Sequence, residues 1–355
     1  MSAPSQSSGS TYINRQMMRT QSTRTPVRKQ VKCWLLGLAK VIGLFAAARW
    51  LTRRGVRILC YHGVWLGDDG FAGDTMFMAA QTFARRLEAI TRLGYPVVTL
   101  EMATAGLTQE ARLPPSPVVV TIDDGWFSTF SCMLPELKKR NMPATLYCDT
   151  EHLENGQPVL NMMTSYLIRD VPNPGEKAFS QDDIRLSYDK SASYERREAA
   201  VTRIADVLGV AVAPYLAKKV FDYMTPAQLA QSAAEGVDVQ LHTHRHSLHD
   251  QSPAQIAQEI ADNRRSLSRI LGRHESAFRH FCYPSGITTK DGAQALAALG
   301  LRSSTTVKQG LAFPGDSMQL LPRILDSENW SMIEFEAELS GFAYLVRWLG
   351  GARAS

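Results

Sequence analysis

Residues 118–126 read Val-Val-Val-Thr-Ile-Asp-Asp-Gly-Trp, and the interpretation of the whole chain depends on this stretch. Its first five residues are mostly β-branched and predict a buried strand, and Asp-Asp-Gly predicts a turn at the C-terminal end of that strand. Two adjacent carboxylates beside an apolar core are costly unless a positive charge lies near them. A divalent metal would supply that charge, with one carboxylate as a ligand and the other as a base. Taken alone, the stretch favours an ordinary solvated Asp-Gly turn, so the rest of the chain has to decide.

The composition is that of an ordinary globular protein. The chain has 355 residues, of which 45% are hydrophobic and 21% charged, enough for one large domain or two average ones. Its net charge of +5 is uneven, because residues 1–57 contain eleven Lys and Arg and no acidic residue. The remainder carries 28 basic residues (39 minus 11) and 34 acidic ones, a net charge of −6, which argues against nucleic acid binding by the folded domain. Its five cysteines form no CxxC pair and predict neither a disulfide framework nor a thiolate zinc site.

The N-terminal segment differs from the rest. Residues 1–30 are rich in Ser, Thr, Gln and Arg and are expected to be a disordered basic tail. Residues 31–54 predict a helix that is apolar but interrupted by Lys40 and Arg49. Three interpretations stay open: a membrane-spanning helix, which the central lysine disfavours by about 2.5–3.5 kcal/mol; a basic amphipathic helix on an anionic membrane; or a helix packed on the domain surface. No small-residue cleavage site follows, so we expect a cytoplasmic or membrane-associated protein without a cleaved signal peptide. Of the three interpretations, the second would make a peripheral membrane contact through residues 31–54.

From residue 55 to residue 349, short strands alternate with helices about eight times, which predicts a parallel β/α domain. Strands are expected at residues 57–64, 97–100, 118–122, 144–148, 237–241, 278–282, 301–305 and 321–325. Helices are expected at residues 83–93, 130–139, 226–235, 253–271, 291–299 and 333–349. Residues 150–222 lack a strong strand pattern and are interpreted as a helical insertion. Histidine, aspartate or Pro-Ser-Gly follows four of the strands, which favours a distorted (β/α) barrel of seven or eight parallel strands over a doubly wound sheet.

Histidines gather after one of these strands. Residues 241–249 read Leu-His-Thr-His-Arg-His-Ser-Leu-His, which includes four of the eight histidines of the chain. The spacing of four predicts that His242 and His246 lie on one side of a helical turn, while His244 and His249 compete for the same role. Two neutral imidazoles and one carboxylate leave a coordination position open. That arrangement is typical of a catalytic zinc or similar ion, with metal–nitrogen distances of ~2.0–2.1 Å.

Four motifs in this order resemble the polysaccharide deacetylase family of carbohydrate esterases, which includes the nodulation-type chitooligosaccharide deacetylases. They are Tyr-His-Gly-Val at 61–64, Asp-Asp-Gly at 123–125, His-Thr-x-x-His at 242–246 and Tyr-Pro-Ser-Gly at 283–286. The resemblance covers about residues 57–340 and favours the catalytic interpretation of the paired aspartates over the solvated turn.

The resemblance implies a role for each matching residue. Asp123 corresponds to the catalytic base of the family. Asp124, His242 and His246 correspond to the ligands of a divalent metal, which is expected to be zinc. His62, in the first motif, is the candidate for the acid that protonates the departing amine.

The last of these motifs, Tyr-Pro-Ser-Gly, corresponds to the third motif of the family and matches it less well. Its usual form is Arg-x-Pro-Tyr-Gly, whereas this chain has Cys282 two residues before the proline and a serine in place of the tyrosine. The resemblance implies that the Ser285 N–H stabilises the oxyanion, with Tyr283 and Pro284 in the same substrate-facing motif. The arginine that orients the base is assigned to Arg323, and the alternative for Arg323 is a surface arginine before a turn.

These roles imply a metal-dependent hydrolase that removes N-acetyl groups from the amino sugars of an oligo- or polysaccharide and releases acetate. In such a reaction the metal polarises the amide carbonyl and lowers the pKa of water toward ~7. Two alternatives stay open: a hydrolase of a small non-sugar amide on the same fold, and a carbohydrate-binding relative without turnover.

Overall fold

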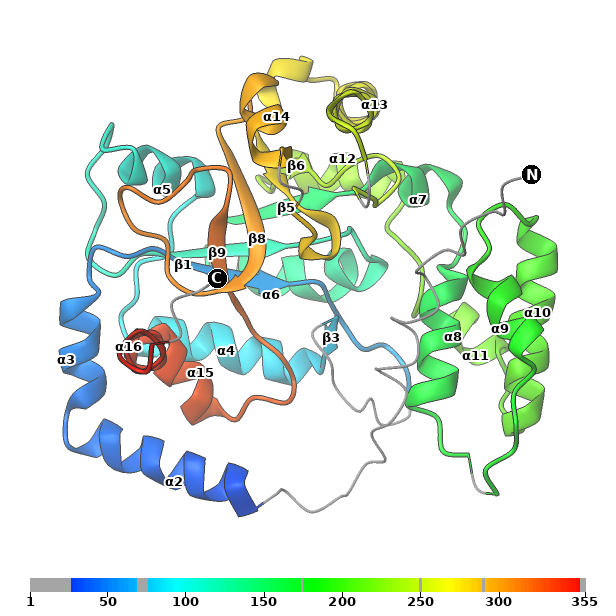
Figure 1. Ribbon diagram of the computed structural model, residues 1–355, viewed down its shortest axis with the longest axis horizontal. Coiled ribbons are helices and arrows are strands. Elements are labelled where there is room, and N and C mark those ends of the chain that lie inside the picture. Colours follow the sequence, from blue (N-terminus) through cyan, green and yellow to red (C-terminus); the bar gives the residue numbers. More distant parts are fainter. Residues whose placement is uncertain (1–26, 69–75, 174, 249–250, 289–290, 352–355) are drawn as a thin grey trace, which may run out of the picture.

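Seven parallel strands form a closed barrel in this computed structural model, which describes residues 27–68, 76–173, 175–248, 251–288 and 291–351 (Figure 1). In spatial order the strands are β1 (Arg57–Tyr61), β4 (Val118–Ile122), β5 (Ala144–Cys148), β6 (Asp238–Leu241), β7 (His280–Cys282), β8 (Ser303–Gln309) and β9 (Leu321–Leu325). The barrel closes where β9 pairs with β1, in the register Leu59 with Ile324. The predicted (β/α) barrel is therefore confirmed, with seven strands.

The central strands are apolar along their whole length because both of their faces are covered. Every residue of β1, β4 and β5 is buried, and β4 pairs with β1 in the register Ile58 with Val119 and Tyr61 with Ile122. Such strands read as continuous apolar runs, without the alternation of a half-exposed sheet.

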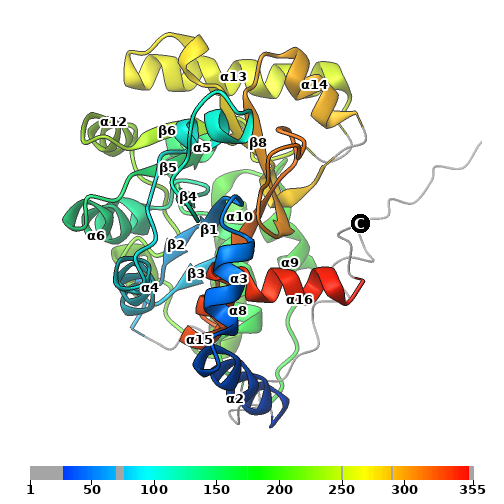
Figure 2. The same ribbon diagram turned by 90° about the vertical axis from the view of Figure 1, so that its left-hand side faces the viewer.

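Helices surround the barrel (Figures 1 and 2). They are α4 (Ala80–Arg92), α5 (Leu100–Leu107), α6 (Leu134–Lys139), α12 (Pro226–Ala234), α13 (Pro253–Leu271), α14 (Gly292–Ala298), α15 (Met332–Leu339) and α16 (Phe342–Leu349). Capping boxes at Thr225, Ser252 and Ser331 satisfy the free N–H groups at the starts of α12, α13 and α15.

Two strand predictions need correction. The strand expected at residues 97–100 is not formed, since Val97 makes only an isolated bridge to Val118 and the Thr99 hydroxyl instead caps α5. The strand expected at residues 57–64 is split. After β1, the two-residue strand β2 (Gly63–Val64) leaves the barrel and pairs with β3 (Phe77–Met78).

One helix prediction is also corrected. The helix expected at residues 333–349 consists of α15 and α16, which are separated at Gly341. Gly341 has a φ of 80°, and a Cβ atom there would lie 2.3 Å from the Thr52 hydroxyl, so the turn requires glycine.

The segment between β5 and β6 contains helices α7 (Thr150–Asn155), α8 (Leu160–Arg169), α9 (Gln181–Tyr188), α10 (Tyr194–Leu208) and α11 (Ala213–Ala217). Its described residues form no strand within 150–222. Helices α8 to α11 pack on a small apolar core of their own that includes Leu167, Ile204 and Phe221. They lie together at one side of the barrel (right in Figure 1).

The N-terminal part of the described chain is helical from Val27 and consists of two helices. These are α2 (Val27–Val41) and α3 (Leu44–Leu51), bent by 75° at a break where Gly43 has a φ of 85°. The tail predicted at residues 1–30 lies outside the described residues up to residue 26. Within the described parts of the chain, no single helix is both long and apolar enough to cross a membrane, although α2 and α3 together meet the criteria of length and composition.

Candidate active site

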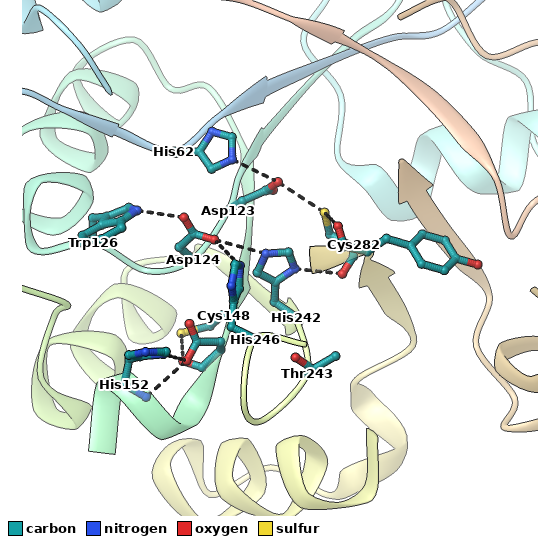
Figure 3. A network of polar contacts seen from close by, with 12 residues as sticks. His62, Asp123, Asp124, Trp126, Cys148, His152, His242, Thr243, His246 and Cys282 are labelled. Atoms are coloured by element: carbon teal, nitrogen blue, oxygen red, sulfur yellow. Dashed lines mark hydrogen bonds and ion pairs between the residues drawn. The ribbon is translucent and has the colours of Figure 1, made fainter. Parts of the chain in front are cut away.

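Polar side chains from four strand ends meet at the C-terminal end of the barrel (Figure 3). Asp123 and Asp124 follow β4, His62 follows β1, His242 and His246 follow β6, and Cys282 is the last residue of β7. The parallel strands bring these positions to one face, although they lie up to 220 residues apart in the sequence (282 minus 62).

Asp124, His242 and His246 form a group that could hold a metal ion. The Asp124 Oδ1 atom lies 3.2 Å from the Nε2 atom of each imidazole. All three donor atoms lie within 4.8 Å of one another. Two metal bonds of ~2.0–2.1 Å at a tetrahedral angle place their donor atoms roughly 3.3 Å apart, so this spacing suits a small divalent ion.

Neighbouring groups orient these three donors. The His242 Nδ1 atom is 2.8 Å from the Cys282 carbonyl oxygen, to which it donates, and this orients the ring with Nε2 facing Asp124. On the other side, Trp126 Nε1 donates to Asp124 Oδ2 at 2.8 Å, so that Oδ1 remains available. Burial by itself raises the pKa of the Asp124 carboxyl, but hydrogen bonds from His242 and His246 outweigh it and hold that pKa well below its usual range.

The turn after β4 has an unusual backbone conformation and packs closely against Cys148. Asp124 and Gly125 both have positive φ values, of 74° and 106°. A Cβ atom at Gly125 would lie 2.9 Å from the Cys148 sulfur, so both the backbone conformation and the space favour glycine. A left-handed conformation at the non-glycine residue Asp124 is strained, and such strain gathers at functional sites.

The loop after β6 brings the two histidines together without a helical turn, which corrects the reason given for their pairing. Thr243 and His246 adopt left-handed conformations, with φ values of 66° and 51°, and the rings of His242 and His246 lie 5.0 Å apart. The Asn263 side chain on α13 accepts the His242 N–H at 3.0 Å and so holds the start of this loop.

The competing histidines do not join this group. His244 Nδ1 lies 2.8 Å from the Thr150 hydroxyl, outside the Asp124 group, and its backbone N–H donates to the Glu259 carboxylate. His249 lies outside the described residues.

Asp123 is held by a buried arginine. Arg323, in the middle of β9, donates to both carboxylate oxygens, at 2.8 Å and 2.7 Å, and its side chain is fully buried. The alternative of a surface arginine before a turn is therefore wrong. Burial alone raises the pKa of Asp123, but the Arg323 guanidinium outweighs it and lowers that pKa to about 2. Asp123 is thus a carboxylate at any ordinary pH.

His62 lies on the other side of Asp123. Its Nε2 atom is 3.8 Å from Asp123 Oδ2, too far for a hydrogen bond but close enough for an ion pair when the imidazole is protonated. Its Nδ1 atom is buried and has no hydrogen-bond partner among the described residues.

Among the described residues, two other groups have donor atoms close enough to hold a metal, and both include Asp123 and a cysteine. One contains Cys60 and His62, and the other contains His242 and Cys282. Burial raises the pKa of both thiols, which keeps them neutral, and the Asp123 oxygens are already bound by Arg323. Thiolates and free carboxylates bind metals, so the Asp124 group is the better candidate.

The motif after β7 begins directly after Cys282, whose carbonyl oxygen accepts from His242. The Tyr283 hydroxyl donates to the Gln319 carbonyl at 3.0 Å, outside the site, and Pro284 is buried. Ser285 is exposed in the following turn with a φ of 54°. Its N–H as an oxyanion contact therefore remains a prediction.

Three residues that shape the site were not singled out for it from the sequence: Trp126, Asn263 and Cys282. Trp126 directly follows the Asp-Asp-Gly motif, so its position was a usable signal. Cys282 donates to Asp123 Oδ2 at 3.2 Å and lies 3.1 Å from Arg323 Nη2, and its position just before the Tyr-Pro-Ser-Gly motif was also a signal. Asn263 lies within a long helix and had no signal in the sequence.

The fold and the site together define a (β/α)-barrel hydrolase with a candidate metal group at the C-terminal ends of its strands. A family model described as polysaccharide deacetylase matches residues 176–304, which contain His242 and His246 but neither aspartate. Over residues 176–304 the chain thus matches the polysaccharide deacetylase family, in agreement with the four motifs on the barrel strands.

Individual relatives are distant but match over most of the chain. The chain is 20% identical over 281 residues to a Bacillus subtilis (strain 168) protein named "Putative polysaccharide deacetylase YxkH", covering 79% of this chain and 74% of that protein. Among solved structures, Streptococcus pyogenes deacetylase PplD in complex with acetate matches with a TM-score of 0.55 and 18% identity, covering 80% of this chain and 98% of that one. IcaB from Ammonifex degensii matches with a TM-score of 0.54 and 21% identity, covering 81% and 97%. At these identities the structural likeness shows the fold.

Proposed function

We propose that this protein is a metal-dependent hydrolase that removes N-acetyl groups from the amino sugars of an oligo- or polysaccharide and releases acetate. The observation that carries the proposal is that two adjacent aspartates have different partners. Asp124 lies 3.2 Å from two imidazoles, and Asp123, the preceding residue, is held by Arg323. The family match over residues 176–304 and the neighbour named as a deacetylase in complex with acetate support amide deacetylation as the reaction.

Asp124, His242 and His246 would hold the metal, which we propose to be zinc. Two imidazole nitrogens and one carboxylate oxygen are a common ligand set of catalytic zinc, with positions left for water and substrate. An ion bound there supplies Lewis acidity, which polarises an acyl oxygen and makes water more acidic.

Asp123 would act as the base that removes the proton from the attacking water. Its pKa of about 2 makes it a weak base, so it can accept a proton only from water that is unusually acidic. This requirement fits its position beside the candidate metal ligand Asp124. Arg323 keeps the carboxylate ionised and fixes its plane through two parallel hydrogen bonds.

His62 would act as the acid. An amine anion is a very poor leaving group, so the nitrogen has to be protonated as the carbon–nitrogen bond breaks. The imidazole lies 3.8 Å from Asp123, so the proposed acid lies beside the proposed base. The Ser285 N–H is the proposed donor to the developing oxyanion.

The deciding experiment is an acetate-release assay on a panel of N-acetylated oligo- and polysaccharides, with the protein as purified, after chelation and after zinc is added back. We expect release from at least one glycan, loss of release with chelator and recovery with zinc. The metal content is measured in the same samples. Protein that holds one equivalent of metal and releases no acetate from any glycan would contradict the proposal.

One observation favours hydrolysis of a small non-sugar amide as a second candidate. The motif after β7 departs from the family pattern, and its Cys282 thiol contacts the proposed base at 3.2 Å. The same assay on small N-acyl amides separates the two substrate classes. Glycan binding without release of acetate from either panel would indicate a carbohydrate-binding relative without turnover.

A further inference from the structure

Three helices on one side of the barrel carry large apolar side chains that face outward. We call this set the apolar surface; each member is between 44% and 84% exposed. Its residues are Val27, Val31, Trp34, Leu35, Leu38 and Val41 of α2, Ile42 of the α2–α3 break, Trp50 and Leu51 of α3, and Val346, Trp348 and Leu349 of α16. Soluble proteins rarely expose contiguous apolar patches of this kind, and such patches mark sites of interaction.

Helix α2 presents an apolar face to solvent, although Ala39 and Leu36 on its other side also belong to a small apolar cluster with α3, α15 and α16. Residues 27, 31, 34, 38 and 41 follow a spacing of four and three that places them on one face. On the other face, Lys32 pairs with Glu334 at 2.9 Å, and Lys40 pairs with Glu336. Ion pairs to α15 therefore hold α2 with its apolar side outward.

Helix α16 is oriented in the same way. Arg347 pairs with Glu338, a third glutamate of α15, at 2.5 Å and 2.8 Å. Arg347 thus faces the protein while Val346 and Trp348 on either side remain exposed. The helices that carry the two parts of the apolar surface are in contact, because Phe45 of α3 and Phe342 of α16 have ring centroids 5.2 Å apart. Figure 2 shows α2, α3 and α16 together on this side of the barrel.

The charge around the apolar surface is basic. Arg28, Arg53 and Arg54 are exposed and form no ion pair with an acidic residue within the described chain. The 26 residues that precede α2 add three arginines and no acidic residue. Exposed tryptophans next to basic residues are typical of segments that lie at the interface of an anionic membrane.

We propose that the apolar surface docks on an anionic lipid bilayer. The ion pairs of Lys32 and Lys40 argue against a spanning α2, since crossing would separate them from Glu334 and Glu336. A second copy of the chain is a less suitable occupant. A face-to-face dimer would bring two sets of unpaired arginines together, and like charges repel.

This docking leaves the active site accessible. Helix α3 leads directly into the N-terminal end of β1, whereas Asp123 and Asp124 lie at the C-terminal ends of the strands. The candidate site thus lies at the end of the barrel away from α3, and variants of the apolar surface leave hydrolysis of a soluble substrate unchanged.

The test uses the full chain in a vesicle flotation assay. One set of vesicles is phosphatidylcholine alone and the other is an equal mixture of phosphatidylcholine and phosphatidylglycerol. We expect the protein to bind the anionic vesicles at least about tenfold more strongly and to be released by high salt. The variant Leu38→Asp with Trp348→Asp should lose about tenfold or more in binding, because both changes put a charge at the lipid contact.

Met102→Asp is the matched control. Met102 is 46% exposed on α5, outside the apolar surface, and the change adds one negative charge, as each of the two substitutions of the double variant does. It should leave vesicle binding within about twofold of the original protein, and circular dichroism shows whether all variants are folded.

Four results would overturn the proposal: no binding to anionic vesicles, equal losses in the control and the double variant, binding that resists both high salt and alkaline carbonate, and a dimer that the double variant dissociates. The third would indicate a spanning segment, and the fourth would indicate a second copy as the occupant. None of these results depends on the substrate, so the docking proposal can fail without affecting the proposed hydrolase activity.

Discussion

Replacing Arg323 by methionine tests the electrostatic arrangement of the site most directly. The guanidinium is fully buried and donates to both oxygens of Asp123, which is itself 2% exposed. In Arg323→Met the carboxylate stays buried and loses its main positive partner. Breaking a buried ion pair by removing one member costs about 3–5 kcal/mol of unfolding free energy.

The pKa of Asp123 gives a second estimate of this magnitude. The folded protein lowers it from 3.8 to about 2, which corresponds to roughly 2.4 kcal/mol of stability. Because the folded pKa lies below the unfolded one, this stability is present above pH ~4 and is lost as the pH falls toward 2. In Arg323→Met, burial is opposed only by the weaker effects of His62 and His242, and the pKa of Asp123 rises. That loss on acidification should then disappear, and stability should instead fall as the pH rises through the new pKa.

The assay is urea unfolding followed by tryptophan fluorescence, in the presence of chelator, at a series of pH values. Arg86→Met is the matched control, since Arg86 is also buried and pairs with Asp326 at 3.0 Å. It should lower stability while the acid-dependent loss between pH 4 and 2 remains. The reasoning is refuted if Arg323→Met costs less than about 1 kcal/mol, the range of exposed ion pairs, or if it retains the acid dependence of the original protein.

Three further predictions concern the individual roles. Asp123→Asn should reduce acetate release by about 10²–10⁴-fold while one equivalent of metal is retained, since only the base is lost; normal turnover in this variant would exclude Asp123 as the base. His246→Ala should lose both bound metal and acetate release, which elemental analysis and the assay measure together, and full metal retention would exclude His246 as a ligand. Trp126→Phe removes the donor to Asp124 Oδ2 and should weaken zinc binding about 10–100-fold in a competitive chelator titration; unchanged affinity would show that this hydrogen bond does not orient the ligand.

Much of the fold could be predicted because parallel strands buried on both faces leave a strong local signal. The apolar run at 118–122 and the similar run at 144–148 are strands of the barrel, as predicted. The strand prediction at residues 97–100 failed because contacts with the rest of the fold decided the backbone conformation there. Val97-Val98 has the composition of a strand, but the Thr99 cap begins a helix immediately after it, and only Val97 pairs with β4, through an isolated bridge.

The candidate site could be predicted in its residue types and only partly in its geometry. The sequence indicated Asp124, His242 and His246 because His-Thr-x-x-His and Asp-Asp-Gly are local motifs that follow strands. It suggested a helical turn for the two histidines, whereas two left-handed residues, Thr243 and His246, bring the rings together. The backbone conformation of such a loop depends on its surroundings, here the Asn263 side chain of α13. The spacing of the histidines in the sequence does not determine that conformation.

The sequence by itself therefore determined which strands form the barrel and which ionisable residues lie at their ends, because hydrophobic runs and local motifs act over a few residues. Only the tertiary structure decided that Arg323 holds Asp123, 200 residues away, and that α2 presents its apolar side to solvent. Both outcomes depend on where opposite charges lie once the barrel has closed. The Asp123 carboxylate holds the buried Arg323 guanidinium, and ion pairs together with an apolar cluster place α2 on α15, so contacts between distant residues decide what the local sequence pattern leaves open.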